Sequence, residues 1–191
     1  MKKNIFILLG HPDKDTLTGS FADIYAEEAK KAGHNVRLMY IQDMDFDPVL
    51  HKGYKEIQEL EPDLITVQEN MKWADHFVIV YPNWWCSMPA ILKGMFDRMF
   101  LPGFAFRFRK DRPGWDQLMK GKTARVMILA NTHPWLIHFL FGDFTNELSR
   151  GILGFAGYKT KVSTFGPSEK APEEKIENWK KKIARFASHG I

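Results

Sequence analysis

Five short apolar runs, each of a length typical of a β-strand, recur along the chain and constrain its fold more than any other feature. They span residues 5–10, 36–41, 77–81, 124–130 and 162–165, and helical patterns lie between most of them. Strands that are apolar on both faces and separated by helices form parallel sheets covered on both sides, because a parallel pair needs a long crossover connection. The sequence therefore predicts an α/β fold with a five-stranded parallel sheet.

Polar residues and prolines indicate where the helices between these strands begin. The apolar run at 135–141 has no clean helical or strand period, so it should be buried on several sides or form an interface or a pocket wall. Gly157 is expected to close the fourth helix. The predicted helices begin after Thr16, at Pro62, around Pro89, after an N-cap at Asp143, and at Pro172.

Length, charge and cysteine content favour one cytoplasmic domain over residues 1–191. The net charge is +4, but Lys and Arg alternate with Asp and Glu instead of forming a tract, which suits a phosphate-bearing ligand better than a nucleic acid. The single cysteine, Cys86, has no partner for an intramolecular disulfide. The N-terminal apolar run is too short for a signal-peptide core or a membrane span, so we expect no membrane insertion.

The loop after the first strand distinguishes between two possible sheet topologies. A dinucleotide-binding domain normally has Gly-x-Gly-x-x-Gly there, whereas residues 10–18 read Gly-His-Pro-Asp-Lys-Asp-Thr-Leu-Thr. A loop rich in Asp and Thr that leads into a helix is the flavodoxin-like way to hold a phosphate. We therefore predict a flavodoxin-like three-layer sandwich with strand order 2-1-3-4-5, in which ligands bind beyond the carboxyl ends of strands one and three.

The third strand runs into an unusually aromatic loop at this switch point, Tyr-Pro-Asn-Trp-Trp-Cys-Ser-Met-Pro at residues 81–89. Trp84 or Trp85 can lie against a planar ring system, and the N–H groups of Trp84, Trp85 and Cys86 can donate to heteroatoms along its edge. Tryptophans in such a loop also form buried aromatic plugs. Composition and position leave both interpretations open.

The chain resembles the NAD(P)H:quinone oxidoreductases of flavodoxin-like fold, together with the bacterial modulators of drug activity and the potassium-efflux ancillary subunits. Weaker likeness continues to the helix that contains Trp179, so the resemblance covers nearly the whole chain. The matching segments are Gly10-His11-Pro12 with Thr16 and Thr18, Asp45-Phe46-Asp47-Pro48, Tyr81-Pro82 through Trp85, Pro89-Ala90-Ile91-Leu92-Lys93-Gly94, Asp97-Arg98, Phe100 and Gly103-Phe104-Ala105-Phe106.

This resemblance implies a flavin cofactor, with FAD narrowly favoured over FMN, and NADH or NADPH as the reductant of a quinone or related small-molecule acceptor. It also implies a homodimer, for which Phe104, Phe106 and the run at 135–141 are candidate contacts. By resemblance, the phosphate or ribityl chain would contact His11, Thr16, Leu17 and Thr18. The ring would be flanked by Pro82, Asn83, Trp84, Trp85 and Cys86, and bordered by Asn131, Thr132 and His133.

The loop after the fourth strand departs from the family pattern. Relatives have Thr-Thr-Gly-Gly where this chain reads Asn-Thr-His-Pro at 131–134, and Pro134 removes one N–H donor. Phe141 stands where the match predicts a histidine of the family's proton relay. His133 or His138 can replace that histidine, and we take His133 as the catalytic candidate, although either can equally be structural.

Two other functions share this fold. A flavodoxin-type electron carrier would use the same cofactor for one-electron exchange with proteins, but such carriers are strongly acidic and this chain is basic. A regulatory ancillary subunit of a membrane transporter is the second alternative. Cys86 has no resolving thiol, which favours a packing role over redox chemistry.

Overall fold

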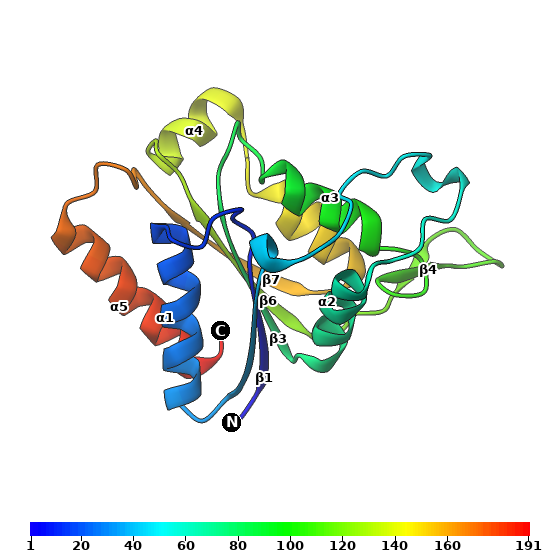
Figure 1. The fold of residues 1–191 in the computed structure, drawn as a ribbon, viewed down its shortest axis with the longest axis horizontal. Helices are drawn as coiled ribbons and strands as arrows, with labels where there is room; N and C mark the ends of the chain where they lie inside the picture. The colour runs from blue at the N-terminus through cyan, green and yellow to red at the C-terminus, as the bar shows by residue number, and fades with distance from the viewer.

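A parallel β-sheet runs through the middle of the computed structural model, which describes residues 1–191 (Figure 1). The strands in this sheet follow the order β2-β1-β3-β6-β7, which is the predicted order 2-1-3-4-5 when they are counted along the chain. The flavodoxin-like topology is thus confirmed. The five strands are β1 (Asn4–Leu9), β2 (Asn35–Tyr40), β3 (His76–Pro82), β6 (Thr123–Leu129) and β7 (Lys159–Phe165).

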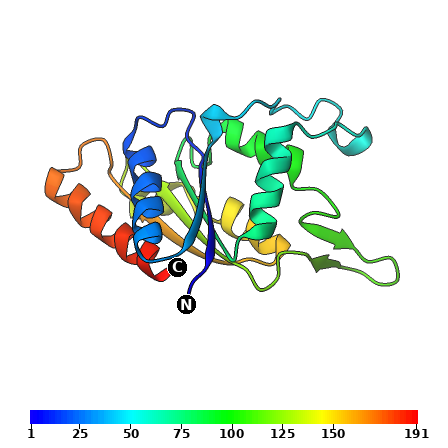
Figure 2. The same cartoon turned by 60° about the horizontal axis from the view of Figure 1, so that its bottom comes forward.

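Helices cover both faces of the sheet and complete three layers (Figures 1 and 2). One face packs against α1 (Leu17–Lys31) and α5 (Glu173–His189). The other packs against α2 (Pro62–Trp73), α3 (Ala90–Met99) and a π-helix, η3 (Glu147–Gly154). Successive side chains of β1 enter the two cores in turn and are fully buried, because alternate residues of a strand face opposite sides. None of the helices combines the length and apolar content needed to cross a membrane.

Two parts of the fold were not predicted from the sequence. A small antiparallel hairpin, β4 (Phe106–Phe108) with β5 (Trp115–Gln117), projects beside α2, and the segment before α2 carries the short 3₁₀ helices η1 (Ile41–Asp43) and η2 (Gly53–Lys55) (Figure 1). The hairpin strands have three residues each and are largely exposed. No apolar run therefore marks them in the sequence.

The apolar run at 135–141 forms a helix, α4 (Pro134–Phe141). This helix is apolar on all sides, and for that reason it has no amphipathic period. In the protomer Ile137 is buried, whereas Trp135, Phe139 and Phe141 are 67%, 80% and 70% exposed. The expectation that this run is buried on several sides is wrong for the single chain, and the expectation of an interface or pocket wall stays a prediction.

The fourth predicted helix begins later than its expected N-cap. Asp143 Oδ1 accepts hydrogen bonds from the backbone N–H and the hydroxyl of Thr145, at 2.8 and 2.7 Å, so it caps the preceding turn. The helix that follows is mostly the π-helix η3. Gly157, at φ +104°, ends this region as predicted, because glycine adopts the left-handed conformation without a steric penalty.

A buried arginine holds the long segment between β2 and α2 against the body. Arg98 of α3 is 1% exposed and donates to Glu61 at 2.9 and 3.1 Å, and to the backbone carbonyls of Glu59 and Asp47. Gly94, one turn earlier, allows the same segment to approach, since a Cβ there would lie 2.4 Å from the Pro48 carbonyl oxygen. This accounts physically for Gly94 and Arg98 in the motif that runs from Pro89 to Arg98.

His76 makes the stability of the fold depend on pH. The residue is 1% exposed at the start of β3, and its Nδ1 lies 2.8 Å from the Thr123 hydroxyl. Burial, with Lys3 and Arg125 nearby, lowers the pKa of His76 to about 3, so the ring is neutral in the folded chain. Unfolding raises this pKa to about 6.5, and protonation of the unfolded chain then favours unfolding. The contribution of neutral His76 to the free energy of unfolding is therefore complete above about pH 6.5 and is lost as the pH falls toward 3.

We expect the free energy of unfolding to fall by about 1.4 kcal/mol per pH unit from His76 alone between about pH 6 and pH 4. Urea unfolding at several pH values measures this slope. A His76→Asn variant should lose this part of the slope, whereas replacing the exposed His138 by Gln should leave it in place. Equal slopes for wild type and His76→Asn would contradict the assignment.

Candidate functional site

The first loop turns directly from β1 into the N-terminus of α1. The Gly10 N–H donates to the Val80 carbonyl at 2.8 Å, and His11 Nδ1 accepts from the Asp13 N–H at 2.9 Å. Thr16 is the N-cap of α1, and its hydroxyl oxygen accepts from the Gly19 N–H at 3.2 Å. The other N–H groups of a first helical turn have no acceptor within the helix, so this end of α1 is suited to an anion.

Gly19 is essential to this arrangement, although sequence reasoning did not single it out. A Cβ at this position would lie 1.9 Å from the backbone carbonyl oxygen of Lys14. The first loop therefore folds back onto α1 closely enough that only glycine fits. A glycine in the first turn of a helix, directly after a Thr-rich loop, is the signal that could have identified it.

The third loop contains a tight turn from Trp84 to Ser87. These two residues exchange backbone hydrogen bonds, N–H to carbonyl, at 2.9 and 3.0 Å. Between them Trp85 and Cys86 have φ angles of +52° and +63°. Two-residue turns of this kind normally use Asn-Gly, and a left-handed conformation costs other residues about 1–2 kcal/mol each. Such strained residues cluster at ligand sites.

The four loops at the carboxyl edge of the sheet are joined by polar contacts. The Asn83 N–H donates to the Leu129 carbonyl at 2.6 Å and so links the third loop to β6. The Ser168 hydroxyl donates to Asn131 Oδ1 at 2.8 Å, which links the loop after β7 to the loop after β6. Trp84 contacts His11 edge to face, with ring centroids 5.6 Å apart. These contacts enclose a single cavity.

This cavity of about 310 Å³ brings together most of the predicted site residues. Trp85, Cys86, Thr132 and His133 lie outside its wall, and Trp85 is fully exposed. Sequence reasoning missed three lining residues, two of which follow β7 and reach the cavity only because β7 pairs with β6. The lining residues are His11, Thr16, Leu17, Thr18, Pro82, Asn83, Trp84, Leu129, Asn131, Ser168 and Glu169.

The polar atoms of the cavity suit a ligand that carries both a phosphate and a planar ring. Asn83 Oδ1 is buried and has no hydrogen-bond partner, so it can accept from a ring N–H. Burial lowers the pKa of His11, although the charge of Asp13 and the backbone hydrogen bond oppose this shift. A largely neutral His11 places no fixed positive charge beside the end of α1, which leaves backbone N–H groups and hydroxyls as the phosphate donors.

Comparison with known proteins places the chain in a family. Residues 3–188 match the family model described as flavodoxin-like fold. The chain belongs to this flavodoxin-like family.

Curated relatives of this family member include two quinone dehydrogenases from mammals. It is 25% identical to rat ribosyldihydronicotinamide dehydrogenase [quinone] over 215 residues, which cover 95% of this chain and 90% of that protein. It is 24% identical to guinea pig NAD(P)H dehydrogenase [quinone] 1, over 95% of this chain and 76% of that protein.

Solved structures share the fold at lower identity. The NAD(P)H:quinone oxidoreductase of Methanothermobacter marburgensis superposes with a TM-score of 0.79 at 21% identity, over 99% of this chain and 97% of that one. An FMN-dependent NADH-azoreductase of Bacillus anthracis in complex with FMN gives a TM-score of 0.67 at 21% identity, over 99% of both chains. These likenesses establish the common fold.

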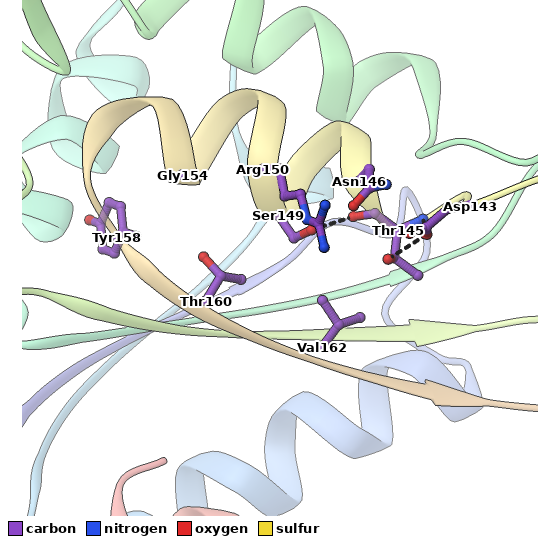
Figure 3. A pocket seen from close by; sticks show the side chains of 9 residues that line it. All are labelled: Asp143, Thr145, Asn146, Ser149, Arg150, Gly154, Tyr158, Thr160 and Val162. Atoms are coloured by element: carbon purple, nitrogen blue, oxygen red, sulfur yellow. Dashed lines mark hydrogen bonds between the residues drawn. The ribbon is translucent and has the colours of Figure 1, made fainter.

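Four other hollows in this flavodoxin-like chain are larger, of about 380 to 700 Å³, and none contains a predicted site residue. Figure 3 shows a polar hollow of about 510 Å³, where Thr160 and Val162 of β7 lie below Ser149 and Arg150 of η3. Its Ser149 hydroxyl is already used, donating to the Thr145 carbonyl at 2.6 Å. An apolar hollow of about 700 Å³ lies between segments 50–58 and 98–108. The smaller cavity at the switch point is therefore the candidate functional site.

Proposed function

We propose that the protein is a flavin-dependent NAD(P)H:quinone oxidoreductase. The observation that carries this proposal is the cavity at the switch point, where the N-terminus of α1, an unpartnered Asn83 oxygen and the Trp84 ring meet. Two relatives that align with 95% of the chain are named as quinone dehydrogenases, which supports the same activity. We propose a cytoplasmic location, which the single cysteine without a disulfide partner favours.

The residues of the cavity fit a flavin nucleotide. The phosphate would lie against Thr16 and be held by the backbone N–H groups of Leu17 and Thr18 and the Thr18 hydroxyl, because both donors of Thr16 are used within the loop. Asn83 would accept a hydrogen bond from the ring. When bound, a flavin supplies a centre that takes hydride from NADH or NADPH and gives it to the acceptor. The chain binds and orients the reactants in turn at one place, so we expect ping-pong kinetics. We favour FAD over FMN on the resemblance of residues 89–94.

Purified protein should be yellow, release flavin on denaturation, and oxidise NADH or NADPH with a quinone acceptor. Chromatography of the released cofactor distinguishes FAD from FMN, and parallel assays compare NADH with NADPH. Turnover without an added reductase would separate the enzyme from a one-electron carrier. Colourless protein that neither FAD nor FMN reconstitutes would refute the proposal.

A pair of glycine variants tests whether the switch-point cavity is the flavin site. Gly19→Ala should weaken flavin binding at least tenfold, because the first loop must move away from α1. Gly151→Ala is the matched control, since a Cβ there meets its nearest neighbour at 3.7 Å without a clash.

We propose that His133 affects turnover more than flavin binding. It occupies the N-cap position of α4, its side chain caps no backbone N–H, and its ring lies 6.2 Å from that of Trp135. An exposed histidine beside Asn131, which lines the cavity, is available to orient the nicotinamide or to donate to a bound quinone.

His133→Ala should lower kcat with quinone about tenfold or more while flavin content stays constant, since general acid help typically contributes that much or more. Stopped-flow measurement of the two half-reactions assigns the effect to NAD(P)H or to the acceptor. Unchanged rates in both half-reactions would make His133 a loop residue without a role in the reaction. His189→Ala, at an exposed position on α5, serves as the control.

We further propose a homodimer that forms through α4. Trp135, Phe139 and Phe141 present an exposed apolar surface that isolated soluble domains rarely tolerate. Phe104, which the sequence suggested as a contact, is only 6% exposed and packs inside the protomer, so α4 carries the argument. Light scattering at micromolar concentration should give twice the 22.2 kDa of one chain. A monomer at that concentration would contradict the proposal.

A further inference from the structure

The Trp84–Ser87 turn needs support from outside itself. Its two central residues, Trp85 and Cys86, are both left-handed and neither is Gly, Asn or Asp. The backbone hydrogen bonds between Trp84 and Ser87 close the turn, but they connect it to nothing else. Trp85 is fully exposed and makes no packing contribution.

One side-chain hydrogen bond ties the turn to the body of the protein. The Ser87 hydroxyl donates to Glu147 Oε2 at 2.5 Å, across 60 positions of sequence. Glu147 is the first residue of η3, the helix that follows α4 and packs on the sheet. Hydrogen bonds to a charged acceptor are short and about twice as strong as neutral ones. The pair therefore joins the third loop to the segment after the fourth.

Glu147 is exposed, and within the protein its carboxylate accepts a side-chain hydrogen bond from Ser87 alone. The carboxylate forms no salt bridge. The nearby Tyr81 remains a neutral phenol, because burial raises its pKa and the charge of Glu147 adds to that shift.

We propose that Glu147 is a positioning residue for the flavin site. By holding Ser87, Glu147 keeps the turn in its left-handed conformation. The closed turn then keeps the Trp84 ring against His11 at the wall of the cavity. The inference rests on the proposed function for its link to flavin. The conformational part concerns only residues of this chain and can be tested without a ligand.

Cys86 provides a built-in probe of this turn. It is the only cysteine of the chain, it lies between Trp85 and Ser87, and it is partly buried against the core. Opening of the turn exposes its thiol. The rate at which an aromatic disulfide reagent labels Cys86 in flavin-free protein therefore reports how often the turn opens.

Ser87→Ala and Glu147→Ala should each raise the labelling rate about fivefold, the factor that corresponds to a net hydrogen bond of about 1 kcal/mol. The double variant should label no faster than either single variant, because both remove the same interaction. Glu147→Gln keeps an oxygen that accepts from Ser87, so its rate should lie between. Glu28→Ala and Thr66→Ala, on α1 and α2, are the controls and should match wild type.

Three further measurements distinguish opening of the turn from loss of global stability and relate it to flavin binding. Urea unfolding of each variant shows whether faster labelling reflects global unfolding instead. Trp85→Asn in the Ser87→Ala background should slow labelling again, because Asn tolerates the left-handed conformation. Titration with FAD and FMN should show about fivefold weaker binding for Ser87→Ala.

Unchanged labelling of both single variants, or additive effects in the double variant, would overturn the positioning role. So would flavin affinities equal to wild type in variants that label faster. If wild type binds no flavin, the proposed function fails, while the labelling rates still decide whether Glu147 holds the turn.

Discussion

The pairing of parallel strands at the centre of the sheet is the interaction on which the site depends. Because β1, β3 and β6 all run in one direction, their carboxyl ends and the loops that follow meet at one edge. The ladder also continues past the strands: Gly10 donates to Val80, and Asn83 donates to Leu129. The first residues of the loops are therefore fixed by backbone hydrogen bonds, and the cavity begins where those bonds end.

The parts of this arrangement that follow from apolar burial could be predicted from the sequence. Strands such as β1 and β3 are buried on both faces, so they are continuous apolar runs with clear limits. The first and third loops follow those runs directly, which is why seven of the predicted residues that line the cavity lie there, while the eighth, Asn131, follows β6. The loop after β7 was missed because its residues Ser168 and Glu169 carry no motif of their own. Only the pairing of β7 with β6 brings them there.

Other features could not be predicted because the sequence signal for them is absent or ambiguous. The β4–β5 hairpin is short and exposed, and α4 is apolar all round, so neither has a period that identifies it. Close approaches of backbone are equally hidden. The positions of Gly19 and Gly94 mark them as unusual, but the backbone segments that approach them, at Lys14 and Pro48, are visible only in the structure.

The two sides of the cavity differ in backbone strain. On the α1 side, Gly19 lets the loop approach without distortion, so this end of the cavity is relaxed. On the β3 side, Trp85 and Cys86 occupy conformations that glycine would adopt more easily, and the fold must stabilise them. A large side chain at such a position points to a need for that side chain itself, since glycine would avoid the strain.

The exposure of Trp85 indicates that its side chain is needed at the surface and not in the core. Its side chain is fully exposed and lines no wall of the cavity, and Trp135, Phe139 and Phe141 of α4 are likewise largely exposed. A cavity of about 310 Å³ is at the lower end of the range for ligand sites, about 300–1,000 Å³. The exposed side chains of the third loop and α4 are therefore available for further contacts, and the proposed flavin and the proposed second protomer are the partners that fit them. The backbone strain at Trp85 then follows from placing its indole on that surface. The Ser87–Glu147 hydrogen bond holds the indole there before a ligand or partner binds.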